Sequence, residues 1–371
     1  GLTHRQKVMN KYLNIVDVPP VDGCDLISTI DVGMQDICEK ALVDKLKELN
    51  AFVGVVVLME VATGEVKAIV NMTKGKDGNY YEMRNNAISD MHGRVMKDWN
   101  WRRGGYGKLT VTEILEVSSN VGTSYIIDHF YGSNPQKYID GLRRMSIDQP
   151  LHLQIAGEGK PNIRGPKERS YFSKTALPWM SIGYETQVLP LNILTFYNAI
   201  ANNGVSIRPK FVKAAVKDGE IVKEYPTEVI NPKICSDKTL AQIREILQKV
   251  VGEGLAKPAG SKQFHVSGKT GTAQISQGAA GYKAGVTNYL VSFCGYFPSE
   301  APKYSMIVSI QKPGPTASGG LMAGSVFSKI AERVYAKDLR LPLTSAIDTN
   351  TVVIPHVKAG EMRQTQRVLE E

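Results

Sequence analysis

The chain has 371 residues, which at about 150 residues per domain allows two or three domains, and its 42% hydrophobic and 22% charged residues are ordinary for globular proteins. Its 34 Gly and 18 Pro residues are too few for a collagen-like or low-complexity chain. The net charge of +9 suits an anionic partner such as nucleic acid, a membrane surface or cell wall, but a mixed, solvated surface gives the same balance.

Composition also argues against metals, nucleic acid and a membrane span. The cysteines form no C-x-x-C pair and the histidines lack metal-ligand spacing, so we expect neither a metal site nor a cofactor. No run of five or six basic residues is present, so we expect no nucleic-acid partner. The longest strongly apolar run, residues 51–59, is too short to cross a bilayer, and no signal peptide is visible.

The first elements predict the opening of an α+β domain. Asp31 is placed to cap a helix over residues 32–49, where apolar residues recur at helical spacing. Residues 54–59 form a β-branched, apolar strand, and residues 66–70 form the returning strand after a turn at Thr63-Gly64-Glu65. A helix followed by a central hairpin is typical of an α+β domain.

Capping residues predict three more helices. Thr110 and Glu113 form a capping box, which indicates a helix from Val111 towards Val117. The other two helices run from Pro190 to Asn203-Gly204 and from Ser236 to Gly252.

The last part of the chain predicts three strands and a helix. The strands cover residues 266–275, 289–297 and 304–310, and apolar residues at helical spacing over 321–334 indicate the helix. The predicted order is therefore helix, hairpin, long helical insert, three strands and helix. The character of the sequence changes after Leu341-Pro342-Leu343, and residues 352–371 resemble the start of a further unit.

Ser267-Gly268-Lys269-Thr270-Gly271-Thr272 is the sharpest local motif. Glycines on a strand leave the backbone bare, so a ligand can approach the main chain closely, while the lysine supplies charge and the hydroxyls can bind a carboxylate. The spacing is not that of a phosphate-binding Walker loop. A glycine-rich edge strand facing solvent is the alternative interpretation.

A second polar motif, Ser118-Ser119-Asn120, follows the helix that Thr110 caps. By itself it can be only a polar helix cap. Together with Lys269-Thr270-Gly271, about 150 residues later, it resembles the S-x-x-K, S-D-N and K-T-G set of penicillin-binding proteins and class A β-lactamases, with S-S-N as the second element.

The resemblance covers residues 27–336 and is specific for class B, monofunctional penicillin-binding proteins. It includes Thr29-Ile30-Asp31 with Gln35, Tyr106-Gly107-Lys108-Leu109-Thr110, Ser181-Ile182-Gly183-Tyr184 with Leu189-Pro190-Leu191, Ala201-Asn202-Asn203-Gly204 and residues 291–298. It implies the α+β penicillin-binding, serine β-lactamase-like transpeptidase fold, an antiparallel sheet flanked by terminal helices plus an inserted all-helical lobe.

The resemblance also implies a domain organisation. Residues 1–21 resemble the end of an N-terminal pedestal, and residues 22–340 form the transpeptidase domain. Residues 341–371 are a linker and the start of a PASTA-like module that is cut short, which favours a septal rather than an elongation enzyme.

The nucleophile motif S-x-x-K is absent from the position where the family has it. Ser309-x-x-Lys312 has the spacing but begins inside the strand predicted over residues 304–310. Thr73-x-x-Lys76 fits only formally, in a Lys-Gly loop after a strand. The family places the motif after a stretch like Asn85-Asn86-Ala87-Ile88, but Ser89-Asp90-Met91 follows there with no room for a helix. Either a segment near Asp90 and Met91 is missing from the printed sequence, which we favour, or the protein has lost it.

The resemblance implies roles for the residues that are present. In the family a serine attacks the carbonyl between the last two D-Ala residues of a peptidoglycan stem peptide, and a neighbouring lysine accepts its proton. Ser118 would relay a proton to the leaving amine, and Asn120 would bind the substrate amide. The positive charge of Lys269 would adjust the electrostatics of the site and favour the substrate carboxylate. Ser119, Thr270, Gly271 and Thr272 would bind substrate, the Thr272 N–H forming half of the oxyanion hole.

Partners and location follow from the same resemblance. The expected partners are peptidoglycan stem peptides, β-lactam antibiotics, a membrane glycan polymerase and division proteins. The expected location is the inner membrane, with a single-pass anchor and the catalytic domain in the periplasm. Two other hypotheses remain open. A non-catalytic sensor or division scaffold would keep the fold without the serine, and a β-lactamase would need a residue such as Glu to activate the deacylating water.

Overall fold

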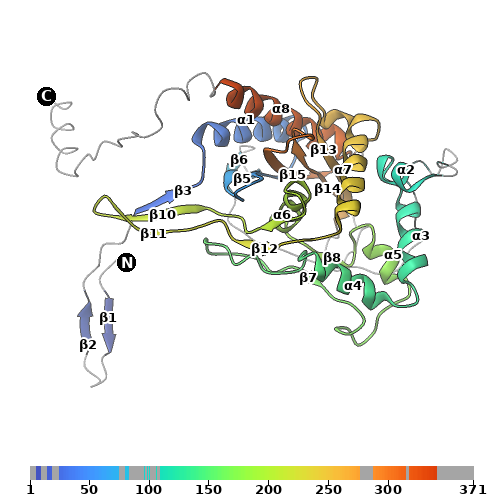
Figure 1. Cartoon of the computed structure of the whole chain (residues 1–371), viewed down its shortest axis with the longest axis horizontal. Helices are drawn as coiled ribbons and strands as arrows, with labels where there is room; N and C mark the ends of the chain where they lie inside the picture. Colours follow the sequence, from blue (N-terminus) through green and yellow to red (C-terminus); the bar gives the residue numbers. More distant parts are fainter. Residues whose placement is uncertain are drawn as a thin grey trace. The chain divides into compact units, whose positions relative to one another are not determined.

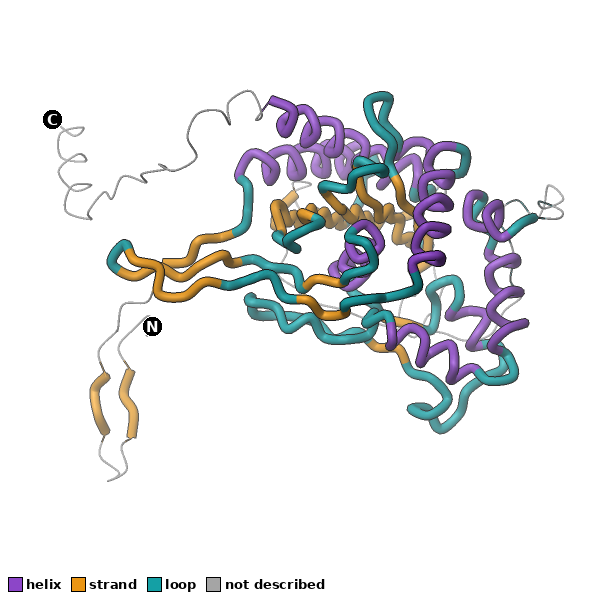
Figure 2. The backbone as a smooth tube through the Cα atoms, in the orientation of Figure 1, coloured by secondary structure: helices purple, strands orange, loops and turns teal. Residues whose placement is uncertain are grey.

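The computed structural model describes residues 25–74, 109–275, 287–314 and 317–340, residues 96, 98, 100 and 106, and the backbone of three short strands (Figures 1 and 2). The chain divides into two units, Gly1–Glu332 and Arg333–Glu371, and the elements below belong to the first except where α8 continues past Glu332. The predicted interruption at 90–91 and the predicted PASTA-like segment lie outside the described residues. Of the predicted pedestal end, the antiparallel pair β1 (Gln6–Met9) and β2 (Ile15–Val18) is described.

A six-stranded antiparallel sheet forms the centre of the first unit, in the order β13-β14-β15-β4-β5-β6. The strands are β4 (Val53–Glu60), β5 (Val66–Lys74), β6 (Tyr80–Glu82), β13 (Ser267–Ile275), β14 (Asn288–Phe297) and β15 (Tyr304–Pro313). All of the predicted strands are confirmed, and so is the fold class. Thr73 lies inside β5 and not at the start of a helix, so the formal Thr73-x-x-Lys76 match has the wrong context.

Helices cover both faces of this sheet. Helix α1 (Val32–Glu48), capped by Asp31, packs on β4 and β5, and α6 (Pro190–Ala201) packs on β14 and β15 from the opposite side (Figure 1). Side chains alternate across a strand. Accordingly Phe293 contacts Phe327 of α8 (Ser325–Arg340), whereas the next residue, Cys294, packs with Leu194 of α6.

A single buried amide ties α6 to the sheet. The Asn198 side chain is fully buried, donates to the Val61 carbonyl at 3.1 Å and accepts from the Ser305 hydroxyl at 2.8 Å. Because a buried polar group costs free energy unless it is hydrogen-bonded, this pairing fixes the position of α6 along the sheet. None of the described helices is long and apolar enough to span a membrane.

An inserted lobe lies between the hairpin and α6. It contains α2 (Val111–Glu116), α3 (Asn120–Tyr131), α4 (Pro135–Arg144) and α5 (Ala176–Met180). The capping box of α2 is present as predicted. The lobe also holds a two-stranded ribbon of β7 (Asn162–Ile163) and β8 (Thr186–Gln187), so its expected all-helical character is not complete.

The strands outside the central sheet were not predicted individually. A separate sheet pairs β11 (Glu220–Glu224), β10 (Val212–Lys217) and β3 (Asp25–Ser28), while β9 (Ser206–Ile207) pairs with β12 (Val229–Asn231). Helix α7 (Asp237–Gly252) begins at its Ser236 cap, as predicted, and packs on β13. The short helix η2 (Lys257–Ala259) follows it. The last predicted helix starts with a π-helical turn, η4 (Gly320–Gly324), before α8.

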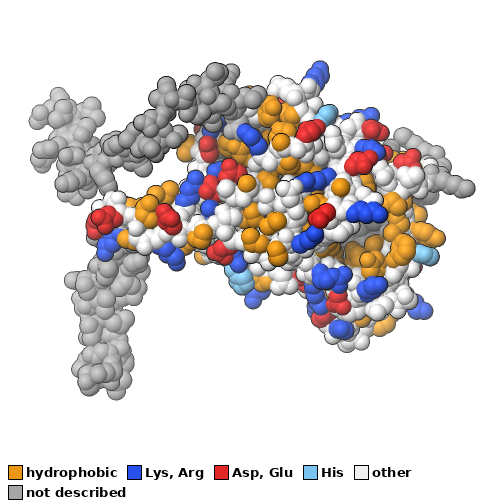
Figure 3. All heavy atoms as spheres, in the orientation of Figure 1, with side chains coloured by type: hydrophobic (Ala, Val, Ile, Leu, Met, Phe, Trp, Pro, Cys, Tyr) orange, Lys and Arg blue, Asp and Glu red, His pale blue; other side chains and the backbone are white. Residues whose placement is uncertain are grey.

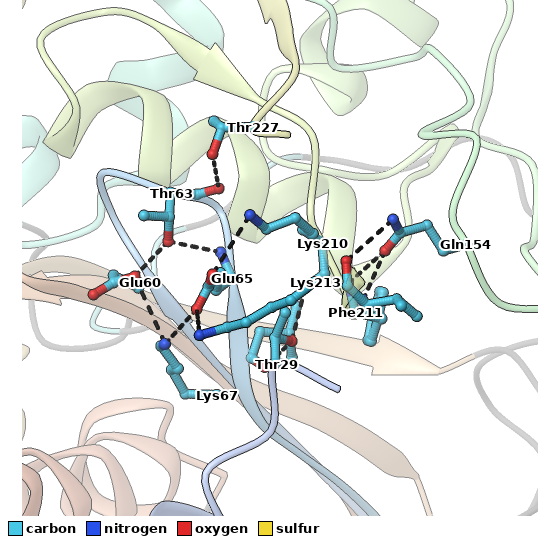
Figure 4. Close-up of polar contacts among 12 residues, drawn as sticks. Thr29, Glu60, Thr63, Glu65, Lys67, Gln154, Lys210, Phe211, Lys213 and Thr227 are labelled. Carbon is cyan, nitrogen blue, oxygen red and sulfur yellow. Dashed lines mark hydrogen bonds and ion pairs between the residues drawn. The ribbon is translucent and has the colours of Figure 1, made fainter. Parts of the chain in front are cut away.

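A charged cluster joins the β4–β5 turn to the start of β10 and to Lys210 just before it (Figure 4). The Glu65 carboxylate contacts the ammonium groups of Lys67 at 2.5 Å, Lys213 at 3.1 Å and Lys210 at 3.4 Å. Burial acts to raise the pKa of Glu65, but hydrogen bonds and charge from Lys67 and Lys213 outweigh it, so this pKa lies below its ordinary value. Gly64 fits the same turn because its φ is +71° and a Cβ there would lie 2.7 Å from the Arg208 carbonyl oxygen.

We predict that Glu65→Gln lowers the free energy of unfolding by about 1–3 kcal/mol at pH 7, because it removes a buried carboxylate from three ammonium groups, two of which are largely shielded from water. A carboxylate with a lowered folded pKa stabilises above its unfolded pKa and loses that contribution as the pH falls through the folded pKa. The difference between parent and variant, measured by urea unfolding, therefore shrinks below about pH 4.5.

The control is Glu228→Gln, which removes an exposed partner of Arg208. We expect a loss of less than about 0.5 kcal/mol there, because exposed ion pairs contribute little. Equal losses in both variants, or a Glu65→Gln deficit that grows in acid, would contradict the interpretation of the cluster.

Candidate active site

The Ser118-Ser119-Asn120 motif forms the turn between α2 and α3. Ser118 has a φ of +52°, in the left-handed region that a non-glycine residue seldom adopts. The amides of Ser118 and Ser119 donate to the carbonyls of Leu115 and Ile114 in α2, at 3.2 and 2.8 Å. These bonds hold the turn against the end of α2.

Ser119 and Asn120 begin helix α3. The Ser119 hydroxyl caps it by accepting from the Gly122 amide at 2.9 Å, and the same hydroxyl donates to Asp98 at 2.9 Å. Ser119 is buried, and its hydroxyl both accepts and donates a hydrogen bond within the protein. The position of Ser119 therefore does not support its predicted contact with substrate. Asn120 is the first residue of the helix.

The Lys269-Thr270-Gly271 motif lies on β13, the edge strand of the central sheet. Lys269 is paired with Cys294, whose side chain packs on the α6 face of the sheet. Since paired residues in an antiparallel sheet share a face, the Lys269 side chain extends from the α6 face. Gly268 permits close packing here, because a Cβ would lie 2.5 Å from the Phe293 ring.

One hydrogen bond joins the two motifs. The Lys269 ammonium lies 2.7 Å from the Ser118 hydroxyl oxygen, across 151 residues of sequence, and 3.3 Å from the Thr270 carbonyl oxygen. Burial of the ammonium lowers the pKa of Lys269 to about 8. The site therefore holds an amine that can exchange a proton near neutral pH, in contact with a hydroxyl that can pass it on.

The free edge of β13 faces the same region. The Gln274 amide donates to the Tyr184 hydroxyl at 3.3 Å, so it points away from β14. In an antiparallel strand every second residue directs its N–H and C=O to the same side. The amides and carbonyls of Thr270 and Thr272 therefore also point to the free edge, where an extended peptide can pair with them.

Thr272 adds a directed hydroxyl at this edge. Its hydroxyl oxygen accepts a hydrogen bond from the Gly319 amide at 3.1 Å, so its own O–H remains able to donate. Gly319 must be small, because a Cβ there would lie 2.6 Å from the Gly271 carbonyl oxygen. The structure thus brings Ser118, Lys269, Thr270 and Thr272 to one region, as the sequence predicts.

Three contributors were not predicted as site residues. Asp98 and Gly319 act through hydrogen bonds to distant elements, and no local pattern marks either. Tyr184 lies in Ser181-Ile182-Gly183-Tyr184, which the family resemblance includes but to which it gave no role. Within the part of the chain that the structure describes, no group of three His, Cys, Asp or Glu residues could hold a metal ion.

Comparison with known families agrees with this geometry. The model of the penicillin binding protein transpeptidase domain matches residues 84–332. The chain belongs to this family. The match includes both motifs, Ser118-Ser119-Asn120 and Lys269-Thr270-Gly271.

The related proteins include several transpeptidases. The peptidoglycan D,D-transpeptidase FtsI of Buchnera aphidicola is 27% identical over 85% of this chain and 59% of its own length. The probable peptidoglycan D,D-transpeptidase PenA of Neisseria meningitidis is 26% identical over 84% of this chain and 56% of its own length. Stage V sporulation protein D of Bacillus subtilis is 27% identical over 72% of this chain and 42% of its own length. The chain thus spans less than two thirds of the length of these relatives.

Solved structures share the fold. Penicillin-binding protein 2X of Streptococcus thermophilus superposes with a TM-score of 0.71 at 18% identity, covering 92% of this chain and 56% of its own. Penicillin-binding protein 3 of Mycobacterium tuberculosis, solved in complex with aztreonam, superposes with a TM-score of 0.67 at 21% identity. The match covers 86% of this chain and 80% of that chain.

We predict that the Lys269 amine reacts with acetic anhydride with a midpoint near pH 8, as its lowered pKa requires. The measurement is the labelled fraction of the Lys269 peptide by mass spectrometry between pH 6 and 11. A blocked lysine peptide in the same tubes should show the ordinary midpoint of about 10.4. A Lys269 midpoint equal to that of the free peptide would contradict a buried amine at this position.

Proposed function

We propose that the protein is a peptidoglycan D,D-transpeptidase that cross-links stem peptides through a serine acyl-enzyme at D-Ala-D-Ala and is acylated by β-lactams. The observation that carries the proposal is the 2.7 Å contact between Lys269 and Ser118. It joins the two family motifs in one site and places an amine of lowered pKa beside a hydroxyl. The relatives named D,D-transpeptidase support the same chemistry.

Lys269 and Ser118 act in proton transfer. With a pKa of about 8, about a tenth of the Lys269 amines are neutral at pH 7, and the charged majority favours the carboxylate of the substrate. When the C–N bond to the last D-Ala breaks, the leaving amine needs a proton. Ser118 donates its hydroxyl proton to that amine and regains one from Lys269.

The β13 edge binds and polarises the substrate. The stem peptide lies along β13 as an added strand and pairs with the outward groups of Thr270 and Thr272. The Thr270 and Thr272 hydroxyls donate to the terminal carboxylate, and the Thr272 N–H stabilises the oxyanion that forms at the attacked carbonyl. Gly271 keeps the strand bare for this approach, and Asn120 binds the substrate amide.

The nucleophile is the residue that the proposal requires and the printed sequence lacks. A serine with a lysine three positions later, in a segment between Asp90 and Met91, attacks the carbonyl and carries the acyl group. The amine of a neighbouring stem peptide then resolves the acyl-enzyme and forms the cross-link.

A non-catalytic sensor of β-lactams or peptidoglycan, or a division scaffold, is the second candidate function. One observation favours it, namely that no Ser-x-x-Lys precedes the Ser118-Ser119-Asn120 motif in the sequence, while the Ser309-x-x-Lys312 match lies in β15. Such a protein binds penicillin reversibly or not at all, whereas the transpeptidase forms a covalent adduct.

The cellular setting is part of the proposal. The relatives named peptidoglycan D,D-transpeptidase FtsI and PenA support a role in cell-wall synthesis. The family resemblance extends this role to the septum, with a membrane glycan polymerase and division proteins as partners. In that setting the whole protein is anchored in the inner membrane and the catalytic domain works in the periplasm.

We predict that Lys269→Ala slows acylation by a fluorescent penicillin about 10²–10³-fold, the loss typical of removing one preorganised electrostatic group at a reacting centre. The measurement is the second-order rate constant for labelling, followed on gels. Lys257→Ala, which removes an exposed lysine of η2, is the matched control and should leave the rate unchanged.

Two results separate the possible failures. A Lys269→Ala rate within a few-fold of the parent rate would contradict the role of Lys269 while leaving the enzyme class intact. An absence of labelling in the parent protein itself would reject the transpeptidase in favour of the non-catalytic candidate.

A further inference from the structure

Asp98 clamps the start of helix α3. One oxygen of its carboxylate accepts from the Ser119 hydroxyl at 2.9 Å, and the other accepts from the Val121 amide at 3.0 Å. The Val121 and Gly122 amides belong to the first turn of the helix, where amides have no partner within the helix. Asp98 supplies the partner of Val121, and Ser119 supplies that of Gly122.

The clamp lies next to a strained residue. Ser118, directly before Ser119, has the left-handed backbone, which a non-glycine residue keeps only where its surroundings impose it. On the α2 side the turn is held by the amides of Ser118 and Ser119. On the α3 side Asp98 holds it through Ser119 and Val121, so the turn is restrained from both ends.

We propose that Asp98 is a positioning residue that keeps the Ser118 hydroxyl against the Lys269 ammonium. The inference rests on the proposed function for the chemical role of Ser118, but the geometry that it concerns is independent of the nucleophile. Asp98 touches neither substrate nor reacting atoms in this account. It acts through the Ser118-Ser119 turn.

A helix cap that only stabilises α3 predicts a different outcome. Loss of such a cap lowers the melting temperature and leaves the environment of Lys269 unchanged. Loss of a positioning residue lets Ser118 leave its left-handed conformation, so water reaches the Lys269 ammonium. Hydration favours the charged form of the lysine and so raises the pH midpoint of the Lys269 titration.

The direction in which the Lys269 midpoint moves distinguishes loss of the Ser118-Ser119 turn from loss of the Asp98 charge. Removing a carboxylate near an ammonium by itself disfavours the charged lysine, and so moves its titration downward. An upward movement on replacing Asp98 therefore reports the loss of the turn.

The test measures the pH midpoint of acetic anhydride labelling at Lys269, together with the melting temperature, in three variants. Asp98→Ala should lower the melting temperature and raise the midpoint by at least about half a pH unit, towards the value of ordinary lysine. Asp98→Asn keeps an acceptor for the Val121 amide, so its midpoint should lie between those of the parent and Asp98→Ala. Asp31→Ala is the matched control, because Asp31 caps α1 through the Met34 amide at 2.9 Å, on the other face of the sheet.

Asp31→Ala should lower the melting temperature without moving the Lys269 midpoint. A destabilised Asp98→Ala with an unchanged midpoint would overturn the proposal and leave Asp98 as a simple cap. Equal midpoint shifts in Asp98→Ala and Asp31→Ala would overturn it too, since the shift would then follow general loss of stability. If Asp98→Ala does not fold, Asp98→Asn decides, because an unmoved or lowered midpoint there contradicts the clamp.

Because the readout is the lysine itself, it does not depend on acylation. A protein that forms no penicillin adduct would lose the proposed function, while the Asp98 variants would still show whether the turn is held in this way.

Discussion

The site depends on one hydrogen bond between the central sheet and the inserted lobe. Lys269 comes from the edge strand of the central sheet, and Ser118 comes from the turn between two helices of the inserted lobe. Neither residue has unusual chemistry in water. Burial of the ammonium lowers the pKa of Lys269 to about 8. The 2.7 Å contact with the Ser118 hydroxyl then lets the pair transfer a proton near neutral pH.

The two parts constrain this contact by different means. On the sheet side, strand alternation decides which groups of β13 reach the free edge, and glycines at positions 268, 271 and 319 allow the backbones to approach. On the helical side, hydrogen bonds restrain a left-handed serine between two helix ends. The viewed face of the protein shows acidic and basic side chains interspersed, so the net positive charge is not gathered there into a basic patch (Figure 3).

Much of this could be predicted from the sequence because its signals are local. The helix caps at Asp31, Thr110 and Ser236 and the apolar strands of the central sheet lie where their patterns predict. The sheet of β3, β10 and β11 was missed because its strands are short and mostly exposed, and because β3 pairs with residues far along the chain. The clamp by Asp98 depends on a contact that exists only in the folded lobe, so no spacing reveals it. The boundaries at residues 21 and 341 stay predictions.

The most direct test of the acyl-enzyme account is the mass of the purified protein before and after incubation with benzylpenicillin, followed by tryptic mapping. Cleavage after Arg84 and Arg94 isolates residues 85–94, the stretch that contains Asp90 and Met91. The account predicts one covalent penicillin per chain, carried on a Ser-x-x-Lys peptide that maps between Asp90 and Met91. An intact 85–94 peptide of the printed sequence, together with no penicillin adduct, would contradict the transpeptidase and leave a binding protein in its place.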